Sequence, residues 1–329
     1  MPALITHYLC GDGVLRELEN AAAKKSIINN RNVFNLGTQG PDIFFYHEAW
    51  PWAKSHDIPA LGDRMHDERT GKFILEALRY AKSAGAAEKP VLTAYLCGYI
   101  CHYALDCQTH PYIFYRTGFI RKGEPDTKKF SSYHRRFETA LDVLMLERMQ
   151  GKKPSGFMAA RHIRISGGDA EIIGRMYSSI FERIYGEKIS VEAVKQSIKD
   201  MASITEVLHD RSGIKKFLLS GVEKLLGMQP MLSSMVHPIR LTEELDYLNL
   251  QHSAWLLPWD KCSKSRQSFP EMFDTAVSEA AKMAAAAAAC LNDSLEQEKT
   301  MELIGNRSFS TGQDCELDNE FLYYDCIYE

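Results

Sequence analysis

Histidine and carboxylate residues recur at intervals of four in two segments of the chain. The first segment reads GYICHYALDCQTHPY and contains His102, Asp106 and His110. The second reads SSYHRRFETALD and repeats the interval with His134 and Glu138. In an α-helix, residues four apart point the same way and lie about 6 Å from each other, so neighbours in such a row can bind one cation. We therefore expect two facing helices that hold more than one metal ion.

The donor types narrow the choice of metal. Neutral imidazole and carboxylate are ligands that zinc accepts, at bond lengths of about 2.0 to 2.2 Å. The ends of the first row lie about 12 Å apart at the helical rise, so His102 and His110 must bind different ions. We expect Asp106 to bridge two ions, one held by His102 and Asp106 and the other by His110, His134 and Glu138. Manganese and iron stay open, and hydrogen-bonded polar residues in a helix-bundle core are the alternative without metal.

The composition is that of a globular protein with a sizeable core: 329 residues, of which 45% are hydrophobic and 25% charged. The net charge of −4 gives no basic surface for a polyanion, so duplex nucleic acid is not an expected partner. The N-terminus has no basic region, and Asp12 interrupts any apolar export signal. No apolar run approaches the about 20 residues of a membrane span, and the eight cysteines form no CxxC pair. These features predict a cytoplasmic protein with reduced thiols.

Strand signals are nearly absent, and the patterns predict an all-α fold. We expect helices at 12–27, 64–84, 90–107, 131–149, 169–186, 190–209, 213–227, 240–250 and 270–303. Pro111 predicts that the helix carrying the first row ends at His110. The final stretch, 313–329, has six acidic residues and no basic one, and we expect it either to dock through its Phe and Tyr residues or to stay mobile.

Further motifs accompany the two rows of histidine and carboxylate residues. They are THYLCGDGVL near the N-terminus, GTQGPDIFFY in the aromatic loop 35–66, and His66 at the end of that loop. Together with the two rows, they make the chain resemble the zinc-dependent phospholipase C family over residues 2 to 150, and zinc-dependent single-strand nucleases more distantly. The resemblance implies a single multi-helix domain with three zinc ions at the base of a cleft. We expect this domain to span 1–260, with 261–329 forming a C-terminal helix and acidic tail that packs on it or trails from it.

The resemblance also implies a set of ligands. One zinc would be held by Asp42, His66, His102 and Asp106, a second by His110, His134 and Glu138, and a third by His7, Asp106 and the amine and carbonyl of Pro2 after removal of Met1. The Pro2 chelate departs from the secreted relatives, which expose a tryptophan there. The interval from Asp106 to His110 is shorter than in those relatives and matches a cytoplasmic branch of the family. Asn249 and His252 resemble positions of that branch, and we expect them to line the cleft.

Such a centre predicts hydrolysis of a phosphoester by a metal-activated water. The expected substrate is a phospholipid or another small phosphodiester, with Asp42 orienting or deprotonating the water. Arg116, Arg135 and Arg136 are candidates for assisting the phosphoryl group. An apolar rim could come from Phe44, Phe45, Tyr46, Trp50 and Trp52, which leaves transient contact with a membrane surface open.

Three other hypotheses stay open. The same metals could act on a nucleotide or single-stranded nucleic acid, with aromatic rings as stacking platforms. The pair His66 and Asp67 would also suit an HD-type phosphohydrolase, although that motif is short. Zinc could instead hold together the helices of a binding protein that has no catalytic activity. Structural zinc sites, however, usually have four protein ligands around one ion. The sequence carries no signal for the oligomeric state.

Overall fold

The computed structural model describes residues 4–49, 57–227, 230, 232–291 and 297–329. Pro2, Trp50 and Trp52 lie outside these residues. The helices are α1 (Leu4–Glu17), α2 (Ala21–Asn29), α3 (Arg31–Gly37), η1 (Gly40–Tyr46), α4 (Asp57–Asp67), α5 (Thr70–Ser83), α6 (Lys89–Thr117), η2 (Pro125–Lys128), α7 (Lys129–Gln150), η3 (Pro154–Gly156), α8 (Ala159–Ile163), α9 (Gly167–Tyr185), α10 (Val191–Leu208), α11 (Ile214–Leu225), α12 (Leu232–Met235), α13 (Phe269–Cys290) and α14 (Gln297–Ile304). The predicted all-α class is confirmed, apart from one short hairpin of β1 (Trp255–Leu257) and β2 (Asp260–Ser265).

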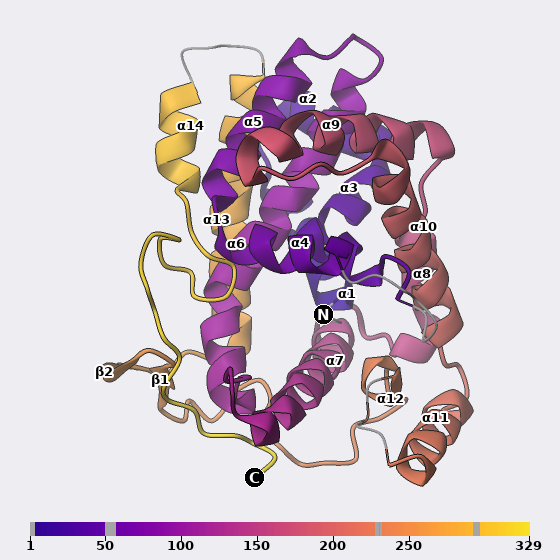
Figure 1. The fold of residues 1–329 in the computed structure, drawn as a ribbon, viewed down its shortest axis with the longest axis vertical. Coiled ribbons are helices and arrows are strands. Elements are labelled where there is room, and N and C mark those ends of the chain that lie inside the picture. The colour runs from indigo at the N-terminus through magenta and orange to yellow at the C-terminus, as the bar shows by residue number, and fades with distance from the viewer. Residues whose placement is uncertain (1–3, 50–56, 228–229, 231, 292–296) are drawn as a thin grey trace.

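Helix α6 is the centre of the fold (Figure 1). It is buried on nearly every side, as expected for a helix without a polar stripe. Helix α13 packs along it, and α1, α2, α3 and α7 also contact it. The alanine-rich α13 starts with a capping box, in which Ser268 Oγ accepts from the Glu271 amide while the Glu271 carboxylate accepts from the Ser268 amide. None of the described helices combines the length and hydropathy that a membrane span requires.

The structure corrects several expected boundaries. Helix α6 does not end at His110 but runs through Pro111 to Thr117, where Gly118 at a φ of 73° closes it. The proline leaves the Cys107 carbonyl without its helical donor, and Gly312 lies against that carbonyl, so close that a Cβ on it would be 2.3 Å from the oxygen. A neighbouring segment thus packs where the helical hydrogen bond is missing.

Other differences follow from local capping. The expected helix 12–27 is two helices, because Asn20 accepts from the Ala23 amide and starts α2. Residues 240–250 are not helical, since Asp246 accepts from the Leu250 and Gln251 amides and holds a turn. The segment 64–84 divides into α4 and α5, with Arg69 at a φ of 55° between them.

A close approach of backbones delivers the GTQGPD motif to α6. A Cβ on Gly37 would lie 2.2 Å from the Tyr95 carbonyl oxygen, so α3 packs directly against α6. Gly40 follows with a φ of +51°, and a Cβ there would lie 2.3 Å from the His102 ring. The motif therefore needs glycine at both positions to bring Asp42 beside the central helix.

A buried carboxylate on α7 fixes the start of α1. Asp142 accepts from the amides of Ile5 and Thr6, at 3.2 and 2.7 Å, and from Thr6 Oγ1 at 2.6 Å. Its second oxygen also faces His237 Nε2 at 2.8 Å. A negative charge at a helix N-terminus satisfies free amides and favours the helix dipole. Asp142 therefore positions His7, which directly follows Thr6 in α1.

Candidate metal centre

Eight side chains of α1, η1, α4, α6 and α7 gather in three groups, and the potential ligand atoms within each group lie within 4.8 Å of one another. The groups are His7, His102 and Asp106; Asp42, His66 and His102; and His110, His134 and Glu138. They contain every ligand expected from the sequence except Pro2, which lies outside the described residues. His102 belongs to two groups, so the first two groups adjoin.

Asp106 lies between the histidines of two groups. Its Oδ2 is 3.0 Å from His102 Nε2, and its Oδ1 is 3.3 Å from His7 Nε2 and 3.8 Å from His110 Nε2. The carboxylate therefore has the position that the sequence predicted for a bridging ligand. Asp106 is 3% exposed and His102 is fully buried, so solvent screens these groups little.

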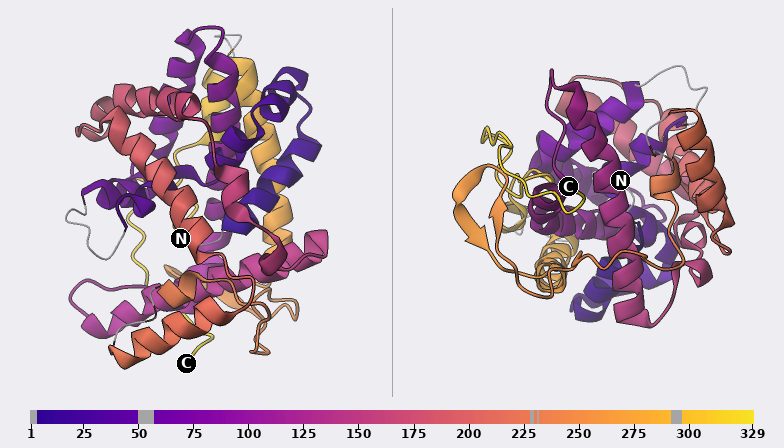
Figure 2. Two further views of the ribbon diagram at one scale, coloured as in Figure 1. Left: turned by 90° about the vertical axis from the view of Figure 1, so that its right-hand side faces the viewer. Right: turned by 90° about the horizontal axis from the view of Figure 1, so that it is seen from below.

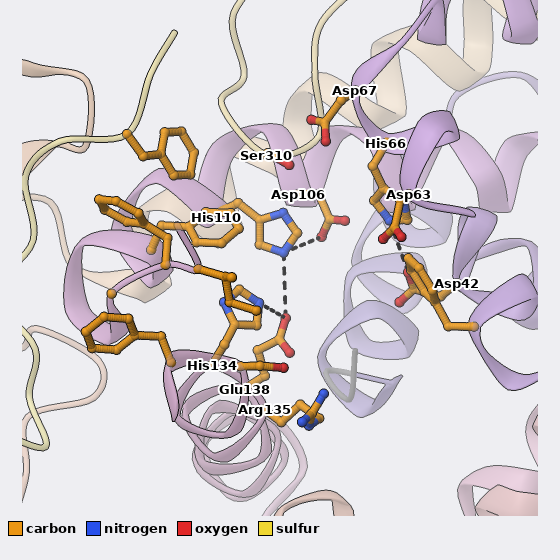
Figure 3. Close-up of a pocket in the computed structure, with 18 of the residues that line it drawn as sticks. Asp42, Asp63, His66, Asp67, Asp106, His110, His134, Arg135, Glu138 and Ser310 are labelled. Atoms are coloured by element: carbon orange, nitrogen blue, oxygen red, sulfur yellow. Dashed lines mark ion pairs between the residues drawn. The ribbon is translucent and has the colours of Figure 1, made fainter. Parts of the chain in front are cut away.

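The other two carboxylates face histidines in the same way. Asp42 Oδ1 lies 3.1 Å from His66 Nε2. Glu138 Oε1 lies 3.2 Å from His134 Nε2 and 3.6 Å from His110 Nε2. Figure 3 shows these pairs on opposite walls of one cavity, with Asp106 between them.

Backbone carbonyls set the orientation of three of the rings. His66 Nδ1 lies 2.7 Å from the Gly62 carbonyl oxygen, His102 Nδ1 3.1 Å from that of Thr38, and His110 Nδ1 2.9 Å from that of Phe309. A carbonyl oxygen only accepts, so each Nδ1 must carry the proton. When such a ring is neutral, it turns an Nε2 lone pair toward the carboxylates, which is how histidine ligands are commonly held.

This donor set fits divalent cations. A lone pair on Nε2 and a carboxylate oxygen repel each other at about 3 Å unless a proton or a cation lies between them. Buried ring nitrogens of His7 (Nδ1), His102 (Nε2) and His134 (Nδ1) also have no hydrogen-bond partner among the described residues. Such atoms are costly to bury without a partner. Imidazole and carboxylate donors without a thiolate fit zinc, and no cysteine belongs to the three groups.

The charges of the site shift the pKa values of Asp106, Asp42 and His110. Burial alone would raise the pKa of Asp106, but the imidazoles of His102, His110 and His7 hold it well below its usual range. Burial likewise opposes ionisation of Asp42, whose pKa is lowered by a hydrogen bond from His66. Burial would lower the pKa of His110, but Asp106 and Glu138 raise it to about 9. Without metal, His110 is therefore protonated on both ring nitrogens at neutral pH.

Metal binding is accordingly expected to release protons at neutral pH. A ligating imidazole must be neutral, so the ion has to displace the Nε2 proton of His110, and affinity should increase as the pH rises toward about 9. Calorimetric titration with zinc in two buffers of different ionisation enthalpy measures the number of protons released. Identical heats in the two buffers would contradict this prediction.

Seven of the eight side chains in the three groups, all except the fully buried His102, line a cavity of about 680 Å³. This volume is within the range of small-molecule sites. The polar part of the lining also contains Asp63, Asp67 and Arg135, and the apolar part, which adjoins His110 and His134 through Phe114, consists of Phe114, Phe119, Ile120, Phe130 and Phe321. A ligand in this cavity would therefore meet both charged donors and an apolar wall.

The C-terminal segment supplies parts of the site that the sequence did not indicate. The Phe309 carbonyl accepts from His110, and its ring packs against His66 and His102 with centroid distances of 5.1 and 5.5 Å. Phe321 lines the apolar side and packs against Phe114. Neither residue has a spacing that relates it to the ligands, since about 200 residues separate Phe309 from His110. The tail also docks on α6, where the Asp325 and Ile327 amides donate to carbonyls of Tyr115 and Arg116.

The three candidate arginines lie in different surroundings in the structure. Arg116 pairs with Asp325 at 2.5 Å, and Arg136 pairs with Glu243. Arg135 lines the cavity beside Glu138 (Figure 3). Its Nε is shielded from solvent and has no hydrogen-bond partner among the described residues. Of the three, Arg135 is the one that the fold directs into the cavity.

The remaining expected site residues lie elsewhere. Asn249 is buried and its amide donates to the carbonyls of Ser253 and Gln267, whereas His252 is exposed beside the Arg266 carbonyl. Neither lines the cavity, so the structure gives no support to their expected place in the cleft. Both have positive φ angles of 51°, which indicates a role in shaping their turn.

The expected aromatic rim is corrected as well. Phe45 lines the cavity, but Phe44 and Tyr46 are buried in the core. Asp67, the second residue of the suspected HD motif, accepts from Ser308 Oγ at 2.6 Å and belongs to none of the three groups. The apolar side of the cavity comes instead from α6, α7, the segment that links them and the C-terminal tail.

Comparisons with known proteins give one match. Searches of curated proteins and of solved structures found no match. A scan against protein families matches residues 6–209 to the family described as zinc dependent phospholipase C. The match includes all the ligand-type residues gathered around the cavity and covers more than half of the chain. The protein belongs to the zinc-dependent phospholipase C family.

Proposed function

We propose that the protein is a zinc-dependent phosphodiesterase of the phospholipase C type, acting on a phospholipid or a similar phosphodiester with an apolar alcohol. The observation that carries this proposal is that one cavity combines a polar and an apolar part. Histidine and carboxylate donors form the polar part, and mainly phenylalanine side chains form the apolar part beside it. A phosphodiester headgroup suits the polar part, and the apolar portion of a lipid suits the apolar part.

We expect different residues of this cavity to bind zinc, to activate water and to bind the substrate. We expect two or three zinc ions, on the three groups of ligands, with the Pro2 amine completing the group of His7. Bound zinc supplies a water of lowered pKa and neutralises charge on the phosphoryl oxygens. Asp42 would hold that water and accept its proton, while Arg135 would donate hydrogen bonds to a phosphoryl oxygen. Phe114 and Phe321 would exclude solvent from the leaving group.

The apolar side favours a lipid over the nucleotide alternative, which requires donors and acceptors for a base. The position of Asp106, whose two oxygens face histidines of different groups, favours a catalytic centre with more than one ion over a structural site. Structural zinc sites usually satisfy one ion with four protein ligands. Here three carboxylates and four histidines of the groups line one cavity, and the fifth histidine, His102, is buried next to Asp106.

The test combines metal content with substrate cleavage. Elemental analysis of unchelated protein is expected to give two or three zinc ions per chain, and the intact mass of the same sample shows whether Met1 is removed. The zinc-loaded protein should release a phosphorylated headgroup from dispersed short-chain phospholipid, and chelation should abolish this release. Full zinc content with no hydrolysis of phospholipids would refute the proposed activity. Cleavage of nucleotides alone would assign the site to the alternative substrate.

A further inference from the structure

Helix α11 turns polar side chains toward the protein and apolar side chains toward solvent. Its side chains that face the protein are Lys216, Leu219 and Glu223, and the two charged ones are bonded there. Lys216 Nζ donates to the carbonyls of Ser233 and Val236, both at 2.7 Å. Glu223 is 5% exposed and accepts from Ser233 Oγ at 2.5 Å. Surface helices usually bury an apolar stripe, and α11 instead buries mainly polar contacts.

The outer face of α11 is an apolar stripe. It consists of Ile214, Phe217, Leu218, Val222 and Leu225, all exposed. Phe217 is 78% exposed and Leu225 is 86% exposed, so they contribute little to the core. At about 100° per residue these five positions fall on one side of the helix. A contiguous stripe of this kind usually marks a contact with a partner or a membrane.

The charges around the stripe are of one sign. Lys215 and Lys224 fall on its opposite edges, and Arg211 precedes the helix; all three are exposed. The Lys215 ammonium donates to the Val207 and His209 carbonyls, which are neutral and leave its charge uncompensated. Within the segment 211–227, the acidic residue Glu223 is buried. An apolar stripe between cations is complementary to a bilayer surface with anionic headgroups.

Helix α11 does not need its apolar stripe in order to form. Asp210 accepts from the amides of Gly213 and Lys216, at 2.8 and 2.9 Å, and so caps the first turn. The inner face is held by the bonds of Lys216 and Glu223. The stripe is thus free to serve another purpose, and its residues can be replaced without removing buried contacts.

We propose that α11 is an interfacial helix that docks the protein on a membrane containing anionic lipid. The apolar stripe would enter the boundary between headgroups and acyl chains, and Lys215 and Lys224 would stay with the headgroups. Figures 1 and 2 place α11 at the same end of the molecule as α7, which carries part of the cavity lining. Ile120, exposed at the cavity, follows α6 at this end. The proposal deepens the proposed lipid activity, but it concerns a surface separate from the metal centre.

The test is flotation of the full-length, zinc-loaded protein with vesicles of phosphatidylcholine, with and without phosphatidylserine. Lipid is analysed after each run to verify that it is intact. Replacing two exposed side chains, Phe217→Gln with Leu225→Gln, should reduce partitioning about a hundredfold. The matched control is Ile28→Gln, an exposed apolar residue of α2 at the other end of the molecule, which should bind as the wild type does. Lys224→Glu should reduce binding about tenfold, and only with phosphatidylserine present.

Several outcomes would overturn the inference. They are wild-type protein that does not float, a double variant that floats as well as the wild type, and equal loss in the Ile28 control. A wild-type dimer that the double variant converts to a monomer, without vesicle binding, would assign the stripe to a second copy instead. Circular dichroism, zinc content and hydrolysis of a water-soluble phosphodiester verify that the variants are folded. Protein that binds vesicles but cleaves no phosphodiester would refute the proposed activity and leave this inference standing.

Discussion

Replacing Asp106 with asparagine is expected to remove both bound metal and activity. Asp106 is 3% exposed, and its two oxygens face histidines of different groups. In the asparagine variant, an amide nitrogen replaces one carboxylate oxygen. The nitrogen does not coordinate a cation, so the side chain no longer bridges two ions, and the loss of its negative charge leaves the repulsion between the ions uncompensated. We expect the loss of at least one zinc ion per chain and a decrease in kcat/KM on the order of a thousandfold. Elemental analysis and headgroup release, measured on the same sample, check this.

A matched control lies one residue further along α6. Cys107 is buried, and its Sγ donates to the Ser308 carbonyl at 3.4 Å, outside the metal groups. Cys107→Ser keeps a donor at this position and should retain both zinc and activity. An Asp106→Asn protein with full zinc content would show that this carboxylate is not the bridge. Equal loss in both variants would indicate damage to α6 itself.

The ligands within each helix could be predicted because helical geometry is local. The spacing of His102, Asp106 and His110 fixes their common face before any tertiary contact is known. That His7 and Asp42 join them depends on tertiary packing, and the sequence indicated it only through family motifs. The structure supplies the physical reasons, namely the cap that Asp142 provides to α1 and the glycine contacts that seat Gly40 against His102.

The missed features arise where local signals and tertiary contacts disagree. Pro111 is a sound local reason to end a helix, yet α6 continues through it, and the C-terminal segment packs at the freed carbonyl of Cys107. The hairpin of β1 and β2 turns at Pro258 and Trp259 rather than at an Asn-Gly pair, so its sequence gives a weak turn signal.

The placement of the C-terminal segment was open for a similar reason. Its composition allowed either docking or mobility, and contacts with distant elements decide between them. The Phe309 amide donates to the His66 carbonyl, and its own carbonyl accepts from His110. Such a segment has no periodic pattern of its own, because it forms no helix or strand and its residues meet several elements. The proposed boundary between 260 and 261 stays a prediction.

Replacing Arg135 with alanine should separate substrate binding from metal binding. Arg135 lines the cavity, is not a metal ligand, and has a shielded Nε without a hydrogen-bond partner among the described residues. A partly desolvated guanidinium binds a phosphoryl group strongly, and often through two hydrogen bonds. We expect kcat/KM to decrease about a hundredfold while zinc content stays unchanged. Arg135→Lys should recover only part of the loss, because an ammonium cannot reproduce the planar fork.

The neighbouring arginine provides the control for this experiment. Arg136 points away from the cavity, pairs with Glu243 and lies over the Tyr328 ring, with 4.3 Å between the guanidinium carbon and the ring centroid. Arg136→Ala should therefore alter stability more than catalysis, and kcat/KM should stay close to that of the wild type. If Arg135→Ala lowered zinc content in parallel with activity, Arg135 would act through the nearby ligand Glu138 rather than on the substrate. If it changed neither, the phosphoryl group would have to be bound by the metal ions alone, and the cavity would need no cationic side chain.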